Sequence, residues 1–222
     1  MTRSIIFGSI GTLAETSHLQ REAFNQAFRE AGLDWHWDES TYFSLLQTSG
    51  GKQRIESYAQ STGTLVDAER IHARKSALFQ GMLSSAALPL RPGVADTLTE
   101  AQKQGIHVAL ATCTSRNNID GILGATGIKA NTFACIVDRS MINEAKPAPD
   151  AFLKALSLLD TPADTVVAIE DNPDGAKSAL AARLACVVTP GAAHENNPFP
   201  EGAKLQSNLT LSAALEGFTQ QS

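Results

Sequence analysis

The first clear hydrophobic pattern is a run of β-branched and aromatic side chains over residues 4–7, followed at once by a glycine-containing segment over residues 8–12. This pattern predicts a buried strand that ends in a loop. Beyond residue 15 the apolar side chains recur at helical spacing, from Leu19 to Phe28, and Gly32 ends that helix. Further helical patterns cover residues 39–46, 52–59 and 68–83, and no convincing strand pattern lies between residues 15 and 89.

After residue 89 the pattern alternates between short strands and helices. Predicted strands cover residues 106–111, 133–137, 166–169 and 186–188, and predicted helices cover 93–104, 117–124, 149–159 and 174–184. The alternation predicts an α/β fold with a doubly wound parallel sheet and helices on both of its faces. The sheet domain then comprises residues 1–14 and 88–222, and residues 15–87 form an inserted helical domain at the edge where such sheets bind ligands.

Composition narrows the classes of function. Of 222 residues, 43% are hydrophobic and 18% are charged, which is enough apolar material for a sizeable core. The formal net charge is −5 and no long run of Lys or Arg occurs, so neither nucleic acid nor an anionic membrane is an expected partner. Three cysteines without a CxxC motif indicate a reducing compartment, and no apolar stretch approaches the ~18 residues of a membrane span. We therefore expect a cytoplasmic protein.

The histidines give no sign of a zinc centre. His36, His72, His107 and His194 lack metal-ligand spacing such as HxxxH. His107 falls within a predicted strand, where we expect it to be buried.

Several polar residues follow predicted strands and are expected to meet at one edge of the sheet. Thr112 would donate a hydrogen bond to a phosphate oxygen, Lys146 would neutralise the phosphate charge, and Asp171 would offer the hard oxygen that Mg²⁺ prefers. Each residue alone has an ordinary structural reading, since Thr caps helices and Glu170-Asp171 could open a helix and complement its dipole. Their joint order favours a site for a phosphoryl group and magnesium.

That order resembles the haloacid dehalogenase superfamily of phosphatases and phosphomutases, and in detail the CbbY-type sugar-bisphosphate phosphatases related to β-phosphoglucomutase. The resemblance covers nearly the whole chain and implies a Rossmann-like core with a small helical cap that closes over the substrate. It is carried by Gly11-Thr12-Leu13-Ala14-Glu15-Thr16, Gly32-Leu33-Asp34-Trp35, Gly50-Gly51-Lys52, Leu90-Arg91-Pro92-Gly93, Ala111-Thr112, Lys146-Pro147, Glu170-Asp171 and Pro190-Gly191.

The resemblance also implies roles for individual residues. The implied phosphate-binding residues are Gly11, Thr112, Ser115 and Lys146. The implied substrate-binding residues are Tyr42, Gly50, Gly51, Lys52, Arg54 and Lys75, with Arg91 from the core. The implied metal ligands are Asp171, Glu170 and the backbone carbonyl of Ile10. Apart from the resemblance, Lys52 and Arg54 also fit a solvated helix start. Gln20 stands where such proteins usually carry a histidine at the cap hinge.

The departure from the family lies in its first motif, Phe-Asp-x-Asp-Gly-Thr-Leu, whose two Asp residues act as nucleophile and as general acid and base. Here Gly8 and Ile10 stand at those two positions. Loss of a general acid/base costs ~10² to 10⁴ in rate, and loss of a nucleophile up to ~10⁶ in a protease. Ser9 is no ready substitute, because alternate residues of an extended segment point to opposite sides. The site therefore has no intact catalytic pair, and its Mg²⁺ affinity is expected to be weakened or lost.

These observations predict a catalytically impaired relative, a pseudoenzyme, that binds a phosphorylated sugar or inorganic phosphate and could serve as a sensor or a partner of another protein. Removing two carboxylates beside Lys146 should reduce the repulsion felt by a bound phosphate. Three alternatives stay open. One is an active hydrolase in which Glu170 or Asp171 activates water or Ser9 attacks, the second is a nucleotide-binding protein, and the third is a purely structural or interaction role.

Overall fold

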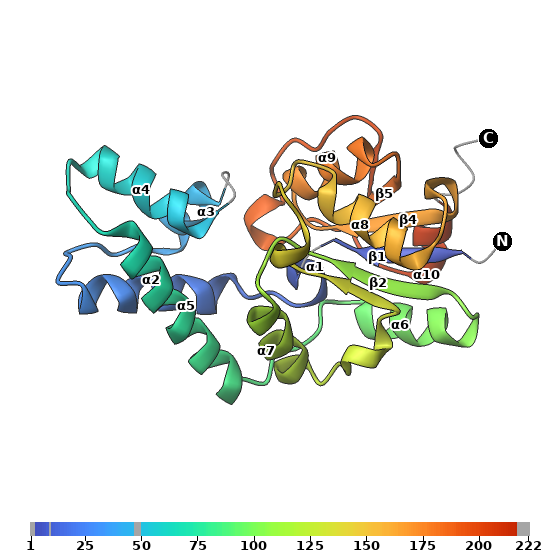
Figure 1. The fold of residues 1–222 in the computed structure, drawn as a ribbon, viewed down its shortest axis with the longest axis horizontal. Helices are drawn as coiled ribbons and strands as arrows, with labels where there is room; N and C mark the ends of the chain where they lie inside the picture. Colours follow the sequence, from blue (N-terminus) through green and yellow to red (C-terminus); the bar gives the residue numbers. More distant parts are fainter. Residues whose placement is uncertain (1–2, 9, 47–49, 217–222) are drawn as a thin grey trace. The chain divides into compact units, whose positions relative to one another are not determined.

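The structure, a computed structural model, describes residues 3–8, 10–46 and 50–216 (Figure 1). Its centre is one six-stranded sheet in the order β3-β2-β1-β4-β5-β6, and every neighbouring pair of strands is parallel. The strands are β1 (Ser4–Phe7), β2 (His107–Ala111), β3 (Cys135–Val137), β4 (Val166–Glu170), β5 (Ala185–Val188) and β6 (Ala203–Leu205). The predicted α/β fold class with a parallel sheet is confirmed.

The two faces of the sheet carry two separate hydrophobic clusters, as strand geometry requires, because successive side chains point to opposite sides. In β1, Ile5 and Phe7 belong to one cluster and Ile6 to the other. Neighbouring strands keep this alternation in register, since Ile5 pairs with Val108 of β2 and with Val167 of β4. All residues of β1 are buried, and after Ser4 its side chains, from Ile5 to Phe7, form a continuous apolar run.

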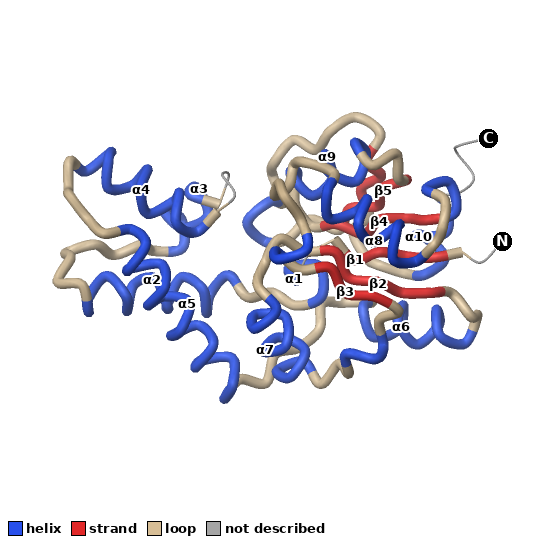
Figure 2. Tube along the Cα trace, in the orientation of Figure 1, coloured by secondary structure: helices blue, strands red, loops and turns tan. Residues whose placement is uncertain are grey.

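Helices cover both faces of the sheet (Figure 2). One cluster takes buried side chains from α6 (Val94–Lys103), α7 (Arg116–Thr126) and α10 (Leu211–Leu215), and the other from α8 (Asp150–Leu159) and α9 (Pro173–Ala181). A short helix α1 (Ile10–Leu13) and four 3₁₀ turns, η1 (Ala130–Thr132), η2 (Arg139–Met141), η3 (Ala163–Thr165) and η4 (Ala192–His194), complete the elements of this part.

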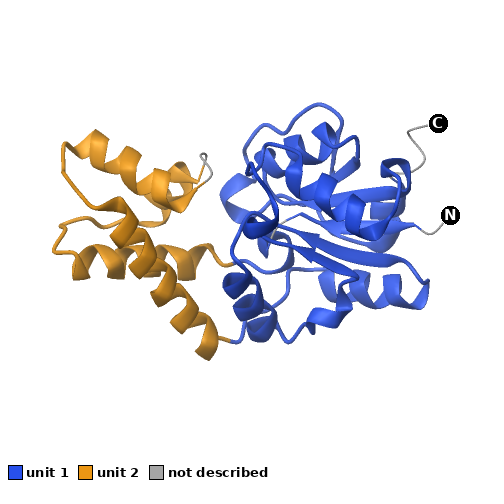
Figure 3. Ribbon diagram, viewed as in Figure 1, with its two compact units in different colours: residues 1–15, 87–222 blue, residues 16–86 orange. Residues whose placement is uncertain are grey.

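The chain forms two compact units, residues 1–15 with 87–222 and residues 16–86 (Figure 3). The boundaries predicted from the sequence lie one residue away from these. The second unit consists of α2 (Ser17–Glu30), α3 (Glu39–Leu45), α4 (Gly51–Thr62) and α5 (Ala68–Ser85). That this unit acts as a cap over a substrate stays a prediction.

The helical unit is built around a cluster of aromatic rings. Phe24 and Phe28 of α2 pack against Trp37, with ring centroids 4.9 and 4.6 Å away. Asn25 fixes the backbone of Trp37, because its amide donates to the Trp37 carbonyl and accepts from the Trp37 N–H, both at 2.8 Å. The aromatic residues are therefore core of this unit, and the buried polar side chain that holds them is hydrogen-bonded at both its nitrogen and its oxygen.

The structure differs from the predictions in a few elements. The segment predicted as a loop after β1 contains α1. Glu170, predicted to follow its strand, is the last residue of β4, and α9 begins at Pro173, one residue before the predicted start. Strand β6 was not predicted, because it is short and only half-buried, so its hydrophobic signal is weak. His107 is exposed at the start of β2, which corrects the prediction that it is buried. Among the described residues, no helix is both long and apolar enough to cross a bilayer.

Candidate functional site

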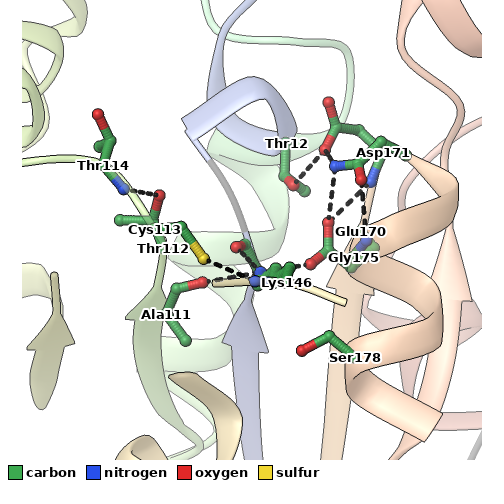
Figure 4. Close-up of polar contacts among 12 residues, drawn as sticks. Thr12, Ala111, Thr112, Cys113, Thr114, Lys146, Glu170, Asp171, Gly175 and Ser178 are labelled. Atoms are coloured by element: carbon green, nitrogen blue, oxygen red, sulfur yellow. Dashed lines mark hydrogen bonds and ion pairs between the residues drawn. The ribbon is translucent and has the colours of Figure 1, made fainter. Parts of the chain in front are cut away.

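The carboxyl ends of β2, β1 and β4 are neighbours in the sheet, and backbone hydrogen bonds hold the residues that follow them. Gly8 N donates to Ile169 O at 2.8 Å, and Thr112 N donates to Val137 O at 3.0 Å. Figure 4 shows that the side chains of Lys146, Glu170 and Asp171 lie together at this edge. The polar residues that follow the predicted strands are thus brought together within the sheet unit.

Lys146 is the centre of this group. Its ammonium donates to the carbonyls of Gly8 and Ala111, the latter at 3.0 Å, and to Glu170 Oε1 at 2.6 Å. The side chain is buried, and the ring of Phe152 lies 4.5 Å from Nζ. A lysine ammonium has three N–H donors, so these three protein oxygens match its full donor capacity.

Glu170 is fully enclosed, with 0% of its surface exposed. Its second oxygen, Oε2, accepts from Asp171 N at 3.3 Å and from Asn172 Nδ2 at 3.4 Å. Burial raises the pKa of Glu170 to about 7, against the opposing effect of Lys146, while the charge of Asp171 raises it further. The carboxyl group therefore has protein partners on both oxygens and no contact with solvent.

The space around the Glu170 carboxyl exists because two neighbouring residues lack side chains. A Cβ on Gly8 would lie 2.0 Å from Glu170 Oε1 and 2.3 Å from Cδ. A Cβ on Gly175 would lie 2.2 Å from the same Cδ. Real Cβ atoms do not approach so closely, so Glu170 occupies the volume that a side chain at position 8 would need.

The other predicted phosphate-binding residues take part in local structure. Thr112 Oγ1 accepts from Thr114 N at 3.3 Å, and Ser115 caps α7 by accepting from Asn118 N at 3.4 Å. Gly11 O accepts a hydrogen bond from Arg91 at 3.3 Å. These bonds leave the phosphate-binding roles of the three residues as predictions.

Arg91, the residue predicted to complete the site from the core, ties backbone segments together. Besides Gly11 O, its guanidinium donates to Thr189 O at 3.0 Å and to Pro190 O at 2.7 Å. It therefore braces the carboxyl end of β5 against α1, and a contact with substrate stays a prediction.

The three predicted magnesium ligands differ in the partners that already hold them. Glu170 is held by Lys146, and Ile10 offers a carbonyl oxygen that accepts from Ala14 N at 3.0 Å. Asp171 is the one predicted side-chain ligand outside the Lys146 ion pair; its Oδ1 accepts from Thr12 at 3.4 Å and from Asn172 at 3.0 Å. No cluster of three or more potential metal-ligating side chains occurs among the described residues. Asp171 and the Ile10 carbonyl thus stand outside the ion pair, and they fit Mg²⁺ if substrate phosphate and water supply its other oxygens; a weakened affinity stays a prediction.

The helical unit holds two buried cations, Arg54 and Lys75. Lys75 Nζ donates to Gln20 Oε1 at 2.6 Å and lies 4.7 and 4.9 Å from the ring centroids of Phe24 and Phe79. Burial, together with the charge of Arg54, lowers the pKa of Lys75 to about 7. The ion pairs among the described residues do not include Lys75.

Arg54 shares the aromatic surroundings of Lys75. Its Nε donates to Leu45 O at 2.9 Å, and its guanidinium carbon lies 5.8 Å from the ring centroid of Tyr42, which is itself buried. Three of the predicted substrate-binding residues, Tyr42, Arg54 and Lys75, thus belong to one buried, positively charged region of the helical unit.

The remaining predicted substrate residues lie at the start of α4. Lys52 pairs with Glu69 at 2.7 Å and with Glu56 at 3.9 Å on an exposed face, as expected for a solvated helix start. Gly50 precedes the helix with φ 99°, a conformation that favours glycine, and a Cβ on Gly51 would lie 2.7 Å from His72 Nε2. Their contact with an anion stays a prediction.

The sequence analysis assigned no role to three residues of the sheet-edge group: Thr12, Asn172 and Gly175. Asn172 caps α9 by accepting from Gly175 N at 2.8 Å, and it also donates to both Glu170 and Asp171. An Asn directly before a Pro is a helix-start signal that could have identified Asn172. No sequence signal links Gly175 to Glu170. Ser9, the alternative nucleophile, lies outside the described residues.

Comparisons with known proteins agree with this architecture. A family model for haloacid dehalogenase-like hydrolases matches residues 2–183. Protein CbbY of Cereibacter sphaeroides is 37% identical over 223 residues, which cover 98% of this chain and 96% of that protein.

Two solved structures are also similar over almost the full length of both chains. CbbY from Rhodobacter sphaeroides in complex with phosphate has a TM-score of 0.88 and 36% identity, covering 99% of this chain and 100% of that one. A mutant of that protein in complex with xylulose-(1,5)bisphosphate has a TM-score of 0.87 and 36% identity, covering 98% and 99%.

Proposed function

Because the chain belongs to the haloacid dehalogenase-like hydrolases, we propose that it binds a phosphorylated small molecule, of the sugar bisphosphate class, and releases phosphate slowly or not at all. The similar CbbY structures hold phosphate and xylulose bisphosphate, which supports this class of ligand. Enzymes of this family typically use Mg²⁺. Bound Mg²⁺ would offset phosphate charge, and Asp171 is the side chain that would hold it.

One observation carries the proposal. At the end of β1, where the family places its two reacting carboxylates, residues 8 and 10 are Gly and Ile. Neither side chain can attack phosphorus or transfer a proton. A chain that has neither reacting group is expected to lose several orders of magnitude in turnover, while the groups that bind anions are kept.

The carboxylate nearest to the missing side chain does not restore the chemistry. Glu170 Oε1 occupies the space that a Cβ of residue 8 would need, and it belongs to a fully buried ion pair. A nucleophile must contact the phosphorus of a bound substrate, and an enclosed carboxylate with protein donors on both oxygens makes no such contact. Glu170 therefore supports the proposal that turnover is impaired.

The binding half of the proposal rests on the helical unit. Lys75 is almost fully buried, and its described polar partner is the neutral side chain of Gln20. A buried ammonium without a counter-charge is costly, and a phosphate dianion would supply that charge. A sugar bisphosphate has two phosphates. We expect the one farther from the missing nucleophile to bind near Lys75 and Arg54.

A direct test is calorimetric titration with xylulose 1,5-bisphosphate, alongside a phosphate-release assay with Mg²⁺ on the same preparation. The expected result is saturable binding that Lys75→Met weakens at least tenfold, with phosphate release at the assay background. Absence of binding would exclude the proposal, and so would turnover comparable with an active family member.

The same assay distinguishes the alternative of an active hydrolase. Turnover that survives Asp171→Asn but is lost in Ser9→Ala would assign attack to Ser9. As a positive control, Gly8→Asp/Ile10→Asp is expected to gain measurable phosphate release, because it returns both reacting groups. The returned Asp at position 8 requires Glu170 to move away, so we expect this gain to remain well below the activity of a native enzyme.

A further inference from the structure

The anion-binding group at the end of β1 already contains an anion, and that anion belongs to the chain. We propose that Glu170 is a built-in ligand of Lys146 that closes this phosphate subsite, so that a phosphoryl group reaches Lys146 only when the Glu170 carboxylate is displaced. The inference refines the proposed function, on which it rests for the nature of the ligand, by assigning the regulation of one of its subsites.

The hydrogen-bonding capacity of Lys146 is fully used within the chain. Its three N–H donors are matched by Gly8 O, Ala111 O and Glu170 Oε1. Two of these acceptors are backbone carbonyls at strand ends and cannot leave without disturbing the sheet. Glu170 Oε1 is the one partner on a side chain, so it is the acceptor that an incoming phosphate oxygen would have to replace.

The Glu170 carboxylate lies in a cradle of small residues and hydrogen-bond donors. Gly8 and Gly175 leave room on either side of it, and a Cβ on either residue would fall within 2.3 Å of the Glu170 carboxyl carbon. Lys146 binds Oε1 (Figure 4). Asp171 N and Asn172 Nδ2, next to the start of α9, donate to Oε2. Donors of this kind bind carboxylates and phosphates alike.

The charges around Lys146 also favour this inference. Replacing the family carboxylates with Gly8 and Ile10 suggests, from the sequence, a lysine left to attract phosphate. In the structure Glu170 provides a negative charge beside Lys146, and Asp171 adds another close by. A phosphate entering this region meets a neutralised lysine and a carboxylate, so repulsion remains at Lys146 even though two other carboxylates are missing.

The test compares the affinity of inorganic phosphate for the native protein and for Glu170→Gln. The substitution keeps the length of the side chain and removes its charge. We expect phosphate to bind Glu170→Gln at least tenfold more tightly, because Lys146 then lacks an anionic partner. The gain should be lost in Glu170→Gln/Lys146→Met and kept in Glu170→Gln/Lys75→Met, which separates the sheet unit from the helical unit.

Glu170→Ala is a second variant, which opens the cradle rather than neutralising it and is expected to show the same gain. Circular dichroism and thermal unfolding identify the variants that are folded. Unchanged or weaker phosphate binding in a folded Glu170 variant would overturn the inference, as would a gain that persists without Lys146.

Failure of the inference and failure of the proposed function are distinguishable. If the native protein binds xylulose 1,5-bisphosphate but the Glu170 variants gain no phosphate affinity, only the inference is wrong. If the Glu170 variants gain affinity while the native protein binds no bisphosphate, the inference holds and the proposed ligand class is wrong.

Discussion

Two buried lysines, one in each unit, have opposite electrostatic surroundings. Lys146 of the sheet unit pairs with the enclosed carboxylate of Glu170 and with two backbone carbonyls. Lys75 of the helical unit has an amide oxygen and two aromatic rings, and no described carboxylate pairs with it. Their exposed fractions are similar, 9% and 5%, so burial alone does not distinguish them.

The difference shows how compensation decides what a buried cation can do. A lysine with an internal counter-ion has its charge compensated within the fold and has little attraction left for a ligand, and removing either partner leaves the other charge buried and uncompensated. A lysine without one is a cost to the fold that a bound anion can remove, and its pKa of about 7 expresses that cost. The retained binding capacity is therefore expected at Lys75, even though Lys146 is the lysine that the sequence places at the phosphate.

The largest expected effect follows from breaking the ion pair of the sheet unit. Lys146→Met leaves the enclosed Glu170 carboxylate without a counter-charge, which should lower the free energy of unfolding by about 3 to 5 kcal/mol. Urea denaturation at pH 8 measures this. Lys75→Met is the matched control; it removes an uncompensated charge and should cause no loss. Equal losses in the two variants would contradict the comparison.

A smaller effect is expected from filling the space beside Glu170. Gly8→Ala places a Cβ on the carboxyl group and should cost about 1 to 3 kcal/mol of unfolding free energy. The loss should shrink when Glu170→Ala is added, because the two changes compete for one volume.

The control for this series is Gly124→Ala in α7, where a Cβ would meet nothing within 4 Å. Alanine favours helix over glycine by up to about 1 kcal/mol, so this variant should be as stable as the native protein or slightly more so. If both glycine variants behave alike in chemical denaturation, Gly8 does not make room for Glu170.

The smallest expected effect is a pH dependence that arises from Lys75. Its folded pKa, about 7, lies below the ordinary value of 10.5, so between these values the unfolded chain binds more protons than the folded one. Stability therefore rises with pH across that window, by up to about 1.4 kcal/mol per pH unit. The charge of Arg54 and the neighbouring His72 belong to the same surroundings, but His72 has a pKa lowered from 6.5 and titrates below the window.

The difference in unfolding free energy between Lys75→Met and the native protein measures this effect. We expect the variant to be more stable at pH 7 and its advantage to decrease by pH 9. An advantage that does not change with pH would show that Lys75 is not the titrating group. Because a bound anion favours the protonated lysine, ligand affinity should fall over the same window.

Much of the fold follows from local patterns in the sequence. Ile5, Ile6 and Phe7 make the run over residues 4–7 predominantly apolar, as is typical of a central parallel strand, and its predicted limits are those of β1. Strand β6 and α10 escaped prediction because short, partly exposed elements carry little periodic signal and depend on the sheet edge they pack against. The loop after β1 was missed as a helix for the same reason, since α1 is a single turn.

The candidate site was predictable only in part. The order of Thr112, Lys146 and Asp171 along the chain was enough to predict that they meet at one edge of the sheet, while phosphate binding there, and the loss of turnover inferred from Gly8 and Ile10, stay predictions. The position of Glu170 was not predictable. Its carboxyl group lies between Gly8 and Gly175, which are far apart in the chain and are brought together only by the fold.

The sequence by itself determined which chemical groups this protein possesses, since composition and motif order do not depend on the fold. The tertiary structure alone decided which charges neutralise one another. Electrostatic compensation falls off steeply with distance, so it depends on separations of a few ångströms between residues such as Lys146 and Glu170, which only the packing of the sheet brings together.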